Sequence, residues 1–140
     1  MGPCAPSTND CSISAVLEDL HYLIEIVKGF QKFCQENAFD YSVMDGIDEE
    51  PITEKTAFIV LEESDLVDLI KYSRQQHLVL GHDMGIISYN ETRLKEILAD
   101  GITVISTNHE KMGETAAYMM LHQQKGKVLN PFTLIRRNSL

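Results

Sequence analysis

Four residues of this sequence carry polar side chains that could contact a small ligand, and each stands just after a run of apolar residues: Glu62, Glu63, Asn90 and His109. Carboxylates accept hydrogen bonds, an amide both donates and accepts them, and an imidazole can stack on a ring or titrate. Each residue also has a simpler interpretation. Adjacent acids at the start of a helix interact favourably with its dipole, Asn is suited to cap a helix, and a His in this position is usually a surface residue. The residue types alone leave both interpretations open.

The sequence contains none of the familiar catalytic motifs: no Gly-x-Ser-x-Gly elbow, no phosphate-binding loop, no HExxH and no CxxC. The three cysteines, Cys4, Cys11 and Cys34, are odd in number and lack metal-ligand spacing, which predicts free thiols in a reducing cytosol. Cys34 lies within an amphipathic segment, which argues against a nucleophile. We therefore expect a binding protein rather than an enzyme, with no cofactor and no metal.

Helix-like and strand-like segments alternate along the chain. Apolar residues recur at steps of three and four from Leu20 to Cys34, which predicts a helix that runs to about Asn37. Short runs rich in Ile, Val and Leu predict buried strands. The predicted order is a helix over 20–37, strands over 41–44 and 57–61, a helix capped by Ser64, a strand over 84–88, a helix over 91–99 that stops at Gly101, a strand over 102–106, a helix capped by Asn108 and a strand over 133–137. Residues 1–19 begin with a stretch rich in Pro, Ser, Asn and Gly and are predicted to form a flexible tail.

This alternation predicts an α/β, Rossmann-like fold, in which right-handed crossovers build a mostly parallel sheet flanked by helices on both faces. In such sheets ligands bind outside the carboxyl ends of the strands. Glu62 and Glu63 follow the first long predicted strand, Asn90 follows the second and His109 follows the third. We therefore expect these four side chains to face one cleft.

The overall charge argues against nucleic-acid binding by this chain alone. Twelve basic residues against 21 acidic residues give a net charge of −9, whereas binding to phosphate backbones requires clustered Lys and Arg. Contact with DNA is therefore expected only through a domain absent from this chain. No apolar run is long enough to span a membrane, and the N-terminus lacks a basic start followed by an apolar stretch, so we expect neither membrane contact nor secretion, but a cytoplasmic location.

Several segments resemble the effector-binding domains of lactose-repressor-type (LacI/GalR) transcriptional regulators. The segments are Glu25–Phe30, the Asp-led run Asp83–Asn90, the Thr-containing run Ile102–Thr107 with Met112-Gly113 and Ala116-Ala117 after it, and the ending Leu134–Leu140 with its Arg and Ser. Their order and spacing cover the chain from about Tyr22 to its last residue. The residues of these segments are most similar to the subgroup that joins this sensor to a GntR-type winged-helix DNA-binding domain.

The resemblance implies a truncated lobe of the type I periplasmic-binding-protein-like fold, with residues 20–140 forming part of an effector-binding domain. In this family two lobes close on a small ligand, often a sugar or sugar derivative, and the chains form homodimers. Glu62 and Glu63 stand where the family has Asn-Asp, Asn90 stands at the first Asp of an Asp-Asp pair, and His109 stands where an aromatic often stacks on the ligand. Two Glu side chains offer only acceptors, which favours a ligand with more donors, or a cation.

The resemblance also implies an unpartnered surface. In the family, the helix that carries Met112, Met119 and Met120 packs on the other lobe, so its apolar face is expected to lack its partner here and to favour self-association. Three alternatives remain open: a solute-binding protein of a transporter, a doubly wound enzyme such as a sugar-phosphate isomerase, and a fragment without independent function.

Overall fold

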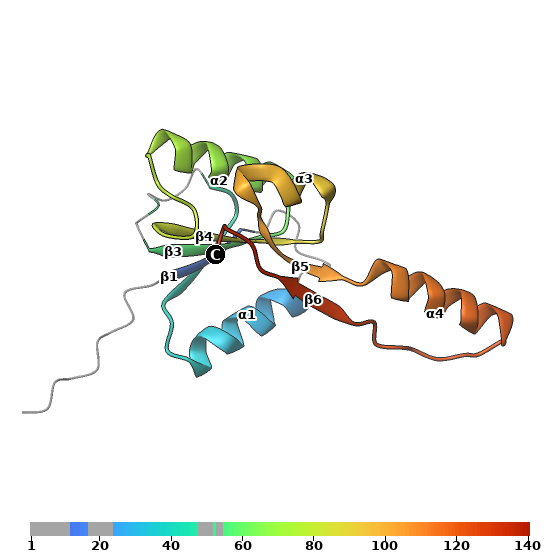
Figure 1. Ribbon diagram of the computed structural model, residues 1–140. Coiled ribbons are helices and arrows are strands. Elements are labelled where there is room, and N and C mark those ends of the chain that lie inside the picture. Colours follow the sequence, from blue (N-terminus) through green and yellow to red (C-terminus); the bar gives the residue numbers. More distant parts are fainter. Residues whose placement is uncertain (1–11, 17–23, 48–51, 53–54) are drawn as a thin grey trace, which may run out of the picture.

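A six-stranded sheet forms the centre of the structure, a computed structural model that describes residues 12–16, 24–47, 52 and 55–140 (Figure 1). Strands β1 to β5 are parallel, and β6 pairs antiparallel with β5, in the order β2-β1-β3-β4-β5-β6. The elements are β1 (Ser12–Val16), α1 (Ile24–Glu36), β2 (Tyr41–Met44), β3 (Thr56–Val60), α2 (Glu63–Gln75), β4 (Met84–Tyr89), α3 (Arg93–Ile97) with a 3-10 turn (Leu98–Asp100), β5 (Thr103–Thr107), α4 (His109–Leu121) and β6 (Phe132–Ile135). The predicted α/β, mostly parallel architecture is confirmed.

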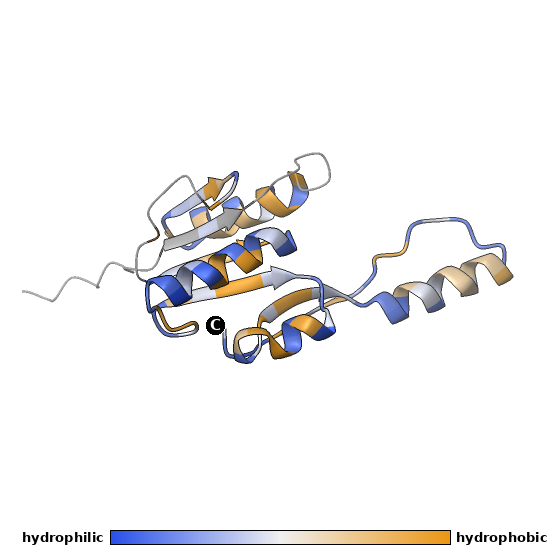
Figure 2. Cartoon of the chain, turned by 90° about the horizontal axis from the view of Figure 1, so that it is seen from above, coloured by the Kyte–Doolittle hydropathy of each residue, from blue (hydrophilic) through white to orange (hydrophobic). Residues whose placement is uncertain are grey.

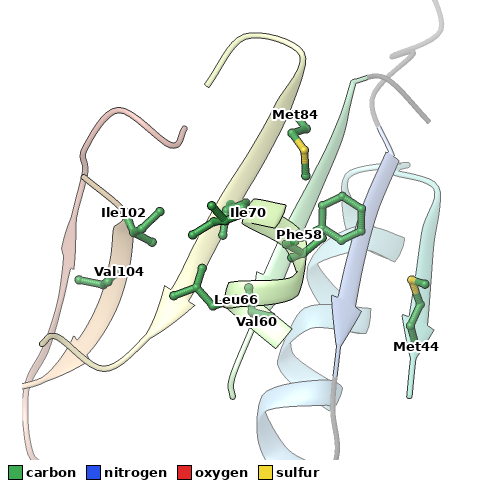
Figure 3. Packing of buried hydrophobic residues seen from close by; sticks show 10 residues of the cluster. Met44, Phe58, Val60, Leu66, Ile70, Met84, Ile102 and Val104 are labelled. Atoms are coloured by element: carbon green, nitrogen blue, oxygen red, sulfur yellow. The ribbon is translucent and has the colours of Figure 1, made fainter. Parts of the chain in front are cut away.

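The main hydrophobic core lies between the sheet and α2. Alternate residues of β3 and β4 point to this face, including Phe58, Val60 and Ile86, and they pack with Leu66 and Leu69 of α2 (Figure 3). Burial of each such side chain stabilises the fold by about 1.5–3 kcal/mol. This core fixes α2 on the sheet, so the N-terminus of α2, with Glu63, is held at the end of β3.

The opposite face of the sheet is covered by α1, while α2 and α3 lie on the first face (Figure 1). Phe30 and Cys34 of α1 are buried against Phe39, Tyr41 and Ile59. The rings of Phe30 and Tyr41 meet edge to face, with 5.6 Å between their centroids. The prediction that the apolar stripe of this helix faces the sheet is confirmed for Phe30 and Cys34, whereas the predicted helix start at Leu20 lies outside the described residues.

The first strand differs from the sequence prediction, because β1 falls within the stretch 1–19 predicted as a tail. It occupies an interior position of the sheet, where it pairs along its length with both β2 and β3. The segment Ser-Ile-Ser-Ala-Val is short and contains two polar residues, so its own pattern is weak. Backbone pairing with β2 on one side and β3 on the other stabilises the strand despite this weak pattern. Residues 1–11 and 17–19 lie outside the described part, and the tail stays a prediction there.

Several predicted helix boundaries were wrong in detail. Glu62, not Ser64, stands at the N-cap position of α2, and Ser64 lies inside the helix. The helix predicted over 91–99 is shorter, because Thr92 caps it and Ala99 adopts a positive φ of 49° in the turn that follows. Val67 of α2 is exposed, although it lies next to the buried Leu66. The predicted cap at Asn108 is confirmed, since its side chain accepts a hydrogen bond from the backbone N–H of Lys111.

The last helix, α4, projects away from the sheet (Figure 1). None of its residues is buried, although it carries large apolar side chains, and Met120 is 81% exposed. Figure 2 shows the apolar residues gathered along its later turns. The expectation that the apolar face of this helix lacks a partner within the chain agrees with the exposure of its described residues.

Candidate functional site

The predicted ligand residues follow three neighbouring parallel strands. Glu62 and Glu63 follow β3 and start α2, Asn90 follows β4, and His109 starts α4 one residue after Asn108. Because these strands run in the same direction, their carboxyl ends lie at one edge of the sheet (Figure 1). Glu62 and Glu63 are exposed there, so their carboxylates are accessible to a ligand.

A buried lysine, Lys95, binds the carboxyl end of β4. Only 3% of it is exposed, and its Nζ donates to the carbonyl oxygens of Tyr89 at 2.8 Å and of Asn90 at 3.0 Å. Burial lowers the pKa of Lys95, while the nearby carboxylates of Glu63, Glu91 and Glu62 act in the opposite direction. The structure therefore brings Glu62, Glu63 and Asn90 around one ammonium group. Sequence reasoning missed this lysine, because a Lys in a short charged helix gives no signal of burial.

Asn90 adopts an unusual backbone conformation at the centre of this edge. Its φ is +63°, in the left-handed region, and its backbone N–H donates to the carbonyl oxygen of Ile105 at 2.8 Å. Its side chain does not cap a helix: Thr92 takes that role by accepting from the N–H of Lys95. Within the described residues, the buried Oδ1 of Asn90 has no hydrogen-bond partner, and neither has the buried Oγ of Ser88. A buried acceptor without a donor costs about 1–3 kcal/mol, so this atom suits a donor from a ligand.

Glu91, next to Asn90, is held by the C-terminal segment. Its carboxylate forms an ion pair with Arg137, which also donates from Nη1 to the carbonyl oxygen of Ile102 at 2.9 Å. The N–H of Glu91 donates to Ser106 Oγ at 3.1 Å. Arg137 therefore has an intramolecular partner in Glu91. The pair explains why Glu91 is not available to a ligand in the same way as Glu62 and Glu63.

The structure does not link His109 to the other three residues. It is exposed in the first turn of α4, and this helix leads away from the sheet. The proposed stacking role of His109 thus stays a prediction, and it requires a ligand or a second protein surface near the base of α4.

An apolar groove of about 630 Å³ runs along the α1 face of the sheet. It lies between α1 and strands β3 to β6, and it reaches the carboxyl edge at Leu61, Tyr89 and Thr107. None of the four predicted ligand residues lines it. Its apolar lining suits the packing of side chains better than the binding of a polyhydroxylated ligand.

The described residues were compared with the requirements of a metal site and of a membrane-spanning helix. In them, no group of three or more His, Cys, Asp or Glu side chains is arranged to hold a metal ion. Among the helices described, none has the length and apolar character needed to cross a bilayer.

Comparison with protein families matches residues 15–140 to the model of the periplasmic binding protein-like domain. No curated protein is similar enough in sequence to count as a match.

Solved structures provide further matches at low sequence identity. The Lac repressor bound to ONPG is 17% identical with a TM-score of 0.72, and the match covers 92% of this chain and 45% of that one. A LacI family regulator from Bifidobacterium animalis subsp. lactis is 19% identical with a TM-score of 0.73, and covers 92% and 54%. The ribose operon repressor protein from Lactobacillus acidophilus is 16% identical with a TM-score of 0.73, and covers 92% and 55%. The likeness shows a shared fold, and the chain spans about half the length of these solved chains.

Proposed function

The chain belongs to the periplasmic binding protein-like family, and from this premise we propose that it is the ligand-sensing part of a LacI-type transcriptional regulator. The observation that carries the proposal is the Asn90 turn, in which a left-handed backbone and a buried, unpartnered Oδ1 lie at the carboxyl edge of a parallel sheet. The similarity in fold to solved LacI family regulators supports the regulatory role.

The ligand we propose is a small molecule rich in hydrogen-bond donors, such as a sugar or an amino sugar. Glu62, Glu63 and Asn90 Oδ1 offer acceptors. Two cations of this region are already engaged, Lys95 with carbonyl oxygens and Arg137 with Glu91, whereas Arg93 at the start of α3 is exposed. A phosphorylated sugar would bring its negative charge close to the exposed carboxylates of Glu62 and Glu63, so a neutral or cationic ligand fits better.

Regulation would follow from differential binding. A ligand that prefers one arrangement of the full protein shifts the population toward it, and this bias alters DNA affinity at a separate domain. The net charge of −9 supports the assignment of DNA contact to a domain other than this one. A cytoplasmic location follows from this role.

Self-association is a second part of the proposal. The exposed apolar residues of α4 and of the segment after it, including Met120, Leu121 and Phe132, form a surface suited to a homodimer. Light scattering should give a mass near twice 15.8 kDa, and Met120→Glu should shift it toward the monomer. A wild-type chain that stays monomeric at high micromolar concentration would refute the proposed homodimer.

Thermal unfolding with added sugars tests the ligand site. D-ribose or ONPG at one hundred times its Kd should stabilise the chain by about 2.7 kcal/mol. Asn90→Gly should abolish this shift, because Gly removes the amide yet adopts a left-handed φ without strain. Asn37→Gly, an exposed position, is the control. Unchanged binding by the Asn90 variant would remove this residue from the site, and measurable turnover of a sugar phosphate would favour the enzyme alternative.

A further inference from the structure

The side chain of Lys95 contacts the backbone of a turn that contains the ligand residue Asn90. Lysine is almost never fully buried unless its charge is compensated. Here the compensation comes from the carbonyl oxygens of Tyr89 and Asn90, at 2.8 and 3.0 Å. These two carbonyls belong to the two peptide units that meet at the Cα of Asn90, so one ammonium group restrains the orientation of both units.

That peptide orientation determines the conformation of Asn90. A left-handed φ costs most non-glycine residues roughly 1–2 kcal/mol and Asn less, so at Asn90 the contacts of the neighbouring peptide groups can select it. Two contacts impose it here: Lys95 Nζ binds the carbonyl oxygen of Asn90, and the N–H of Asn90 donates to Ile105. The side chain of Asn90 itself contributes no hydrogen bond from Oδ1 within the described residues.

We propose that Lys95 is a positioning residue of the ligand site: it holds the turn at Asn90 in its left-handed form and so sets the position of Oδ1, an acceptor that is buried and unpartnered within the described residues. The role of Lys95 in ligand binding rests on the proposed function, whereas its role in holding the turn rests on the geometry alone. Lys95 would not touch the ligand, because it is buried beneath the turn.

The charge of Lys95 has a second consequence for the same edge. Glu62, Glu63 and Glu91 all lie close enough to interact with it electrostatically. Without this charge, three carboxylates would share the edge, where Arg137 pairs directly with Glu91. Lys95 therefore also relieves the repulsion between the loop after β3 and the loop after β4.

The test uses three variants of the full 140-residue chain. Lys95→Met keeps the length but removes the donors and the charge, whereas Lys95→Arg retains both. Lys71→Met is the matched control, because Lys71 is an exposed lysine of α2 that pairs only with Asp68, at 3.4 Å. The readouts are the intraresidue amide–Hα NOE of Asn90, which is strong only at positive φ, and the affinity for D-ribose and ONPG.

We expect Lys95→Met to weaken the Asn90 NOE and to reduce the affinity at least tenfold. Lys95→Arg should keep the NOE and most of the affinity, and Lys71→Met should change neither. If Lys95→Met does not fold, Lys95→Gln replaces it, with the same expected direction. A strong NOE together with wild-type affinity in the Met or Gln variant would overturn the proposal, even if the melting temperature fell. If the wild type binds neither sugar, the proposed function fails, and the NOE alone decides whether Lys95 holds the turn.

Discussion

Replacement of Ser139 by alanine is expected to lower the free energy of unfolding by about 2–4 kcal/mol, because each of two buried, uncharged backbone groups left without a partner costs about 1–2 kcal/mol. Ser139 is fully buried. Its Oγ accepts from the N–H of Thr103 at 2.8 Å and donates to the carbonyl oxygen of Ile86 at 2.6 Å. These bonds join the C-terminal segment to β4 and β5 where the two strands begin. Alanine fills almost the same space, so the hydrogen bonds are the main quantity lost.

Urea unfolding followed by circular dichroism measures this change. The midpoint should fall while the m value stays constant, since the fold and its buried surface are otherwise retained. For a chain of this size the loss corresponds to a melting temperature lower by roughly 6–12 °C. Asn138→Ala is the control: its Nδ2 donates to the carbonyl oxygen of Asp100 at 2.8 Å, but at an exposed position. That bond should contribute less than about 1 kcal/mol.

A cost below about 0.5 kcal/mol for Ser139→Ala, within the usual range of surface substitutions, would refute the reasoning. The N–H of Thr103 and the carbonyl oxygen of Ile86 would then have found other partners. The claim that the C-terminal segment is anchored between the strands, and thereby brings Arg137 to Glu91, would lose its basis.

Three further predictions concern single side chains. Gly81→Ala should strongly destabilise the fold in urea titrations, because a Cβ there would lie 2.2 Å from the carbonyl oxygen of Asn138 and Gly81 has a φ of +80°; wild-type stability would contradict this. Cys34 should resist iodoacetamide in the native chain and react after denaturation, since it is fully buried and burial raises its thiol pKa; peptide mass mapping that finds native alkylation would disprove it. The hydrogen bond from the N–H of Val79 lowers the pKa of Asp83 below its usual 3.8. Its stabilising effect is therefore present above that value and lost as the pH falls through the lowered pKa, so Asp83→Asn should flatten the acid limb of the thermal stability curve, and an unchanged limb would exclude Asp83 as its cause.

The strands that sequence reasoning located best are those whose pattern and surroundings agree. The run predicted over 84–88 became β4, Met84–Tyr89, because alternate residues pack into the α2 core. Strand β1 could not be recognised from its own residues. Its stability comes from pairing with β2 and β3, and such non-local contacts override a weak local pattern.

The candidate site shows the same division between topology and local detail. Parallel strand direction was enough to place Glu62, Glu63 and Asn90 at one edge. The burial of Lys95 was not predictable, since α3 has only five residues and too few turns for an apolar stripe to define its inward face. Leu94 is instead 55% exposed, while the lysine beside it points inward. Lys95 faces inward because its ammonium group donates to the carbonyl oxygens of Tyr89 and Asn90, which an apolar side chain could not do.

The edge thus combines two kinds of acceptor that should contribute differently to recognition. The Asn90 turn is held from several sides, by Lys95, by Ile105 and, through Glu91, by Arg137. A turn fixed in this way binds without further loss of backbone entropy, so it favours a ligand whose donor has the matching geometry. The side chains at positions 62 and 63 are exposed and free to adjust, which costs entropy on binding but tolerates ligands of different shape. Selectivity should therefore depend on the rigid turn, whereas the preference for donor-rich or cationic ligands should depend on the two carboxylates.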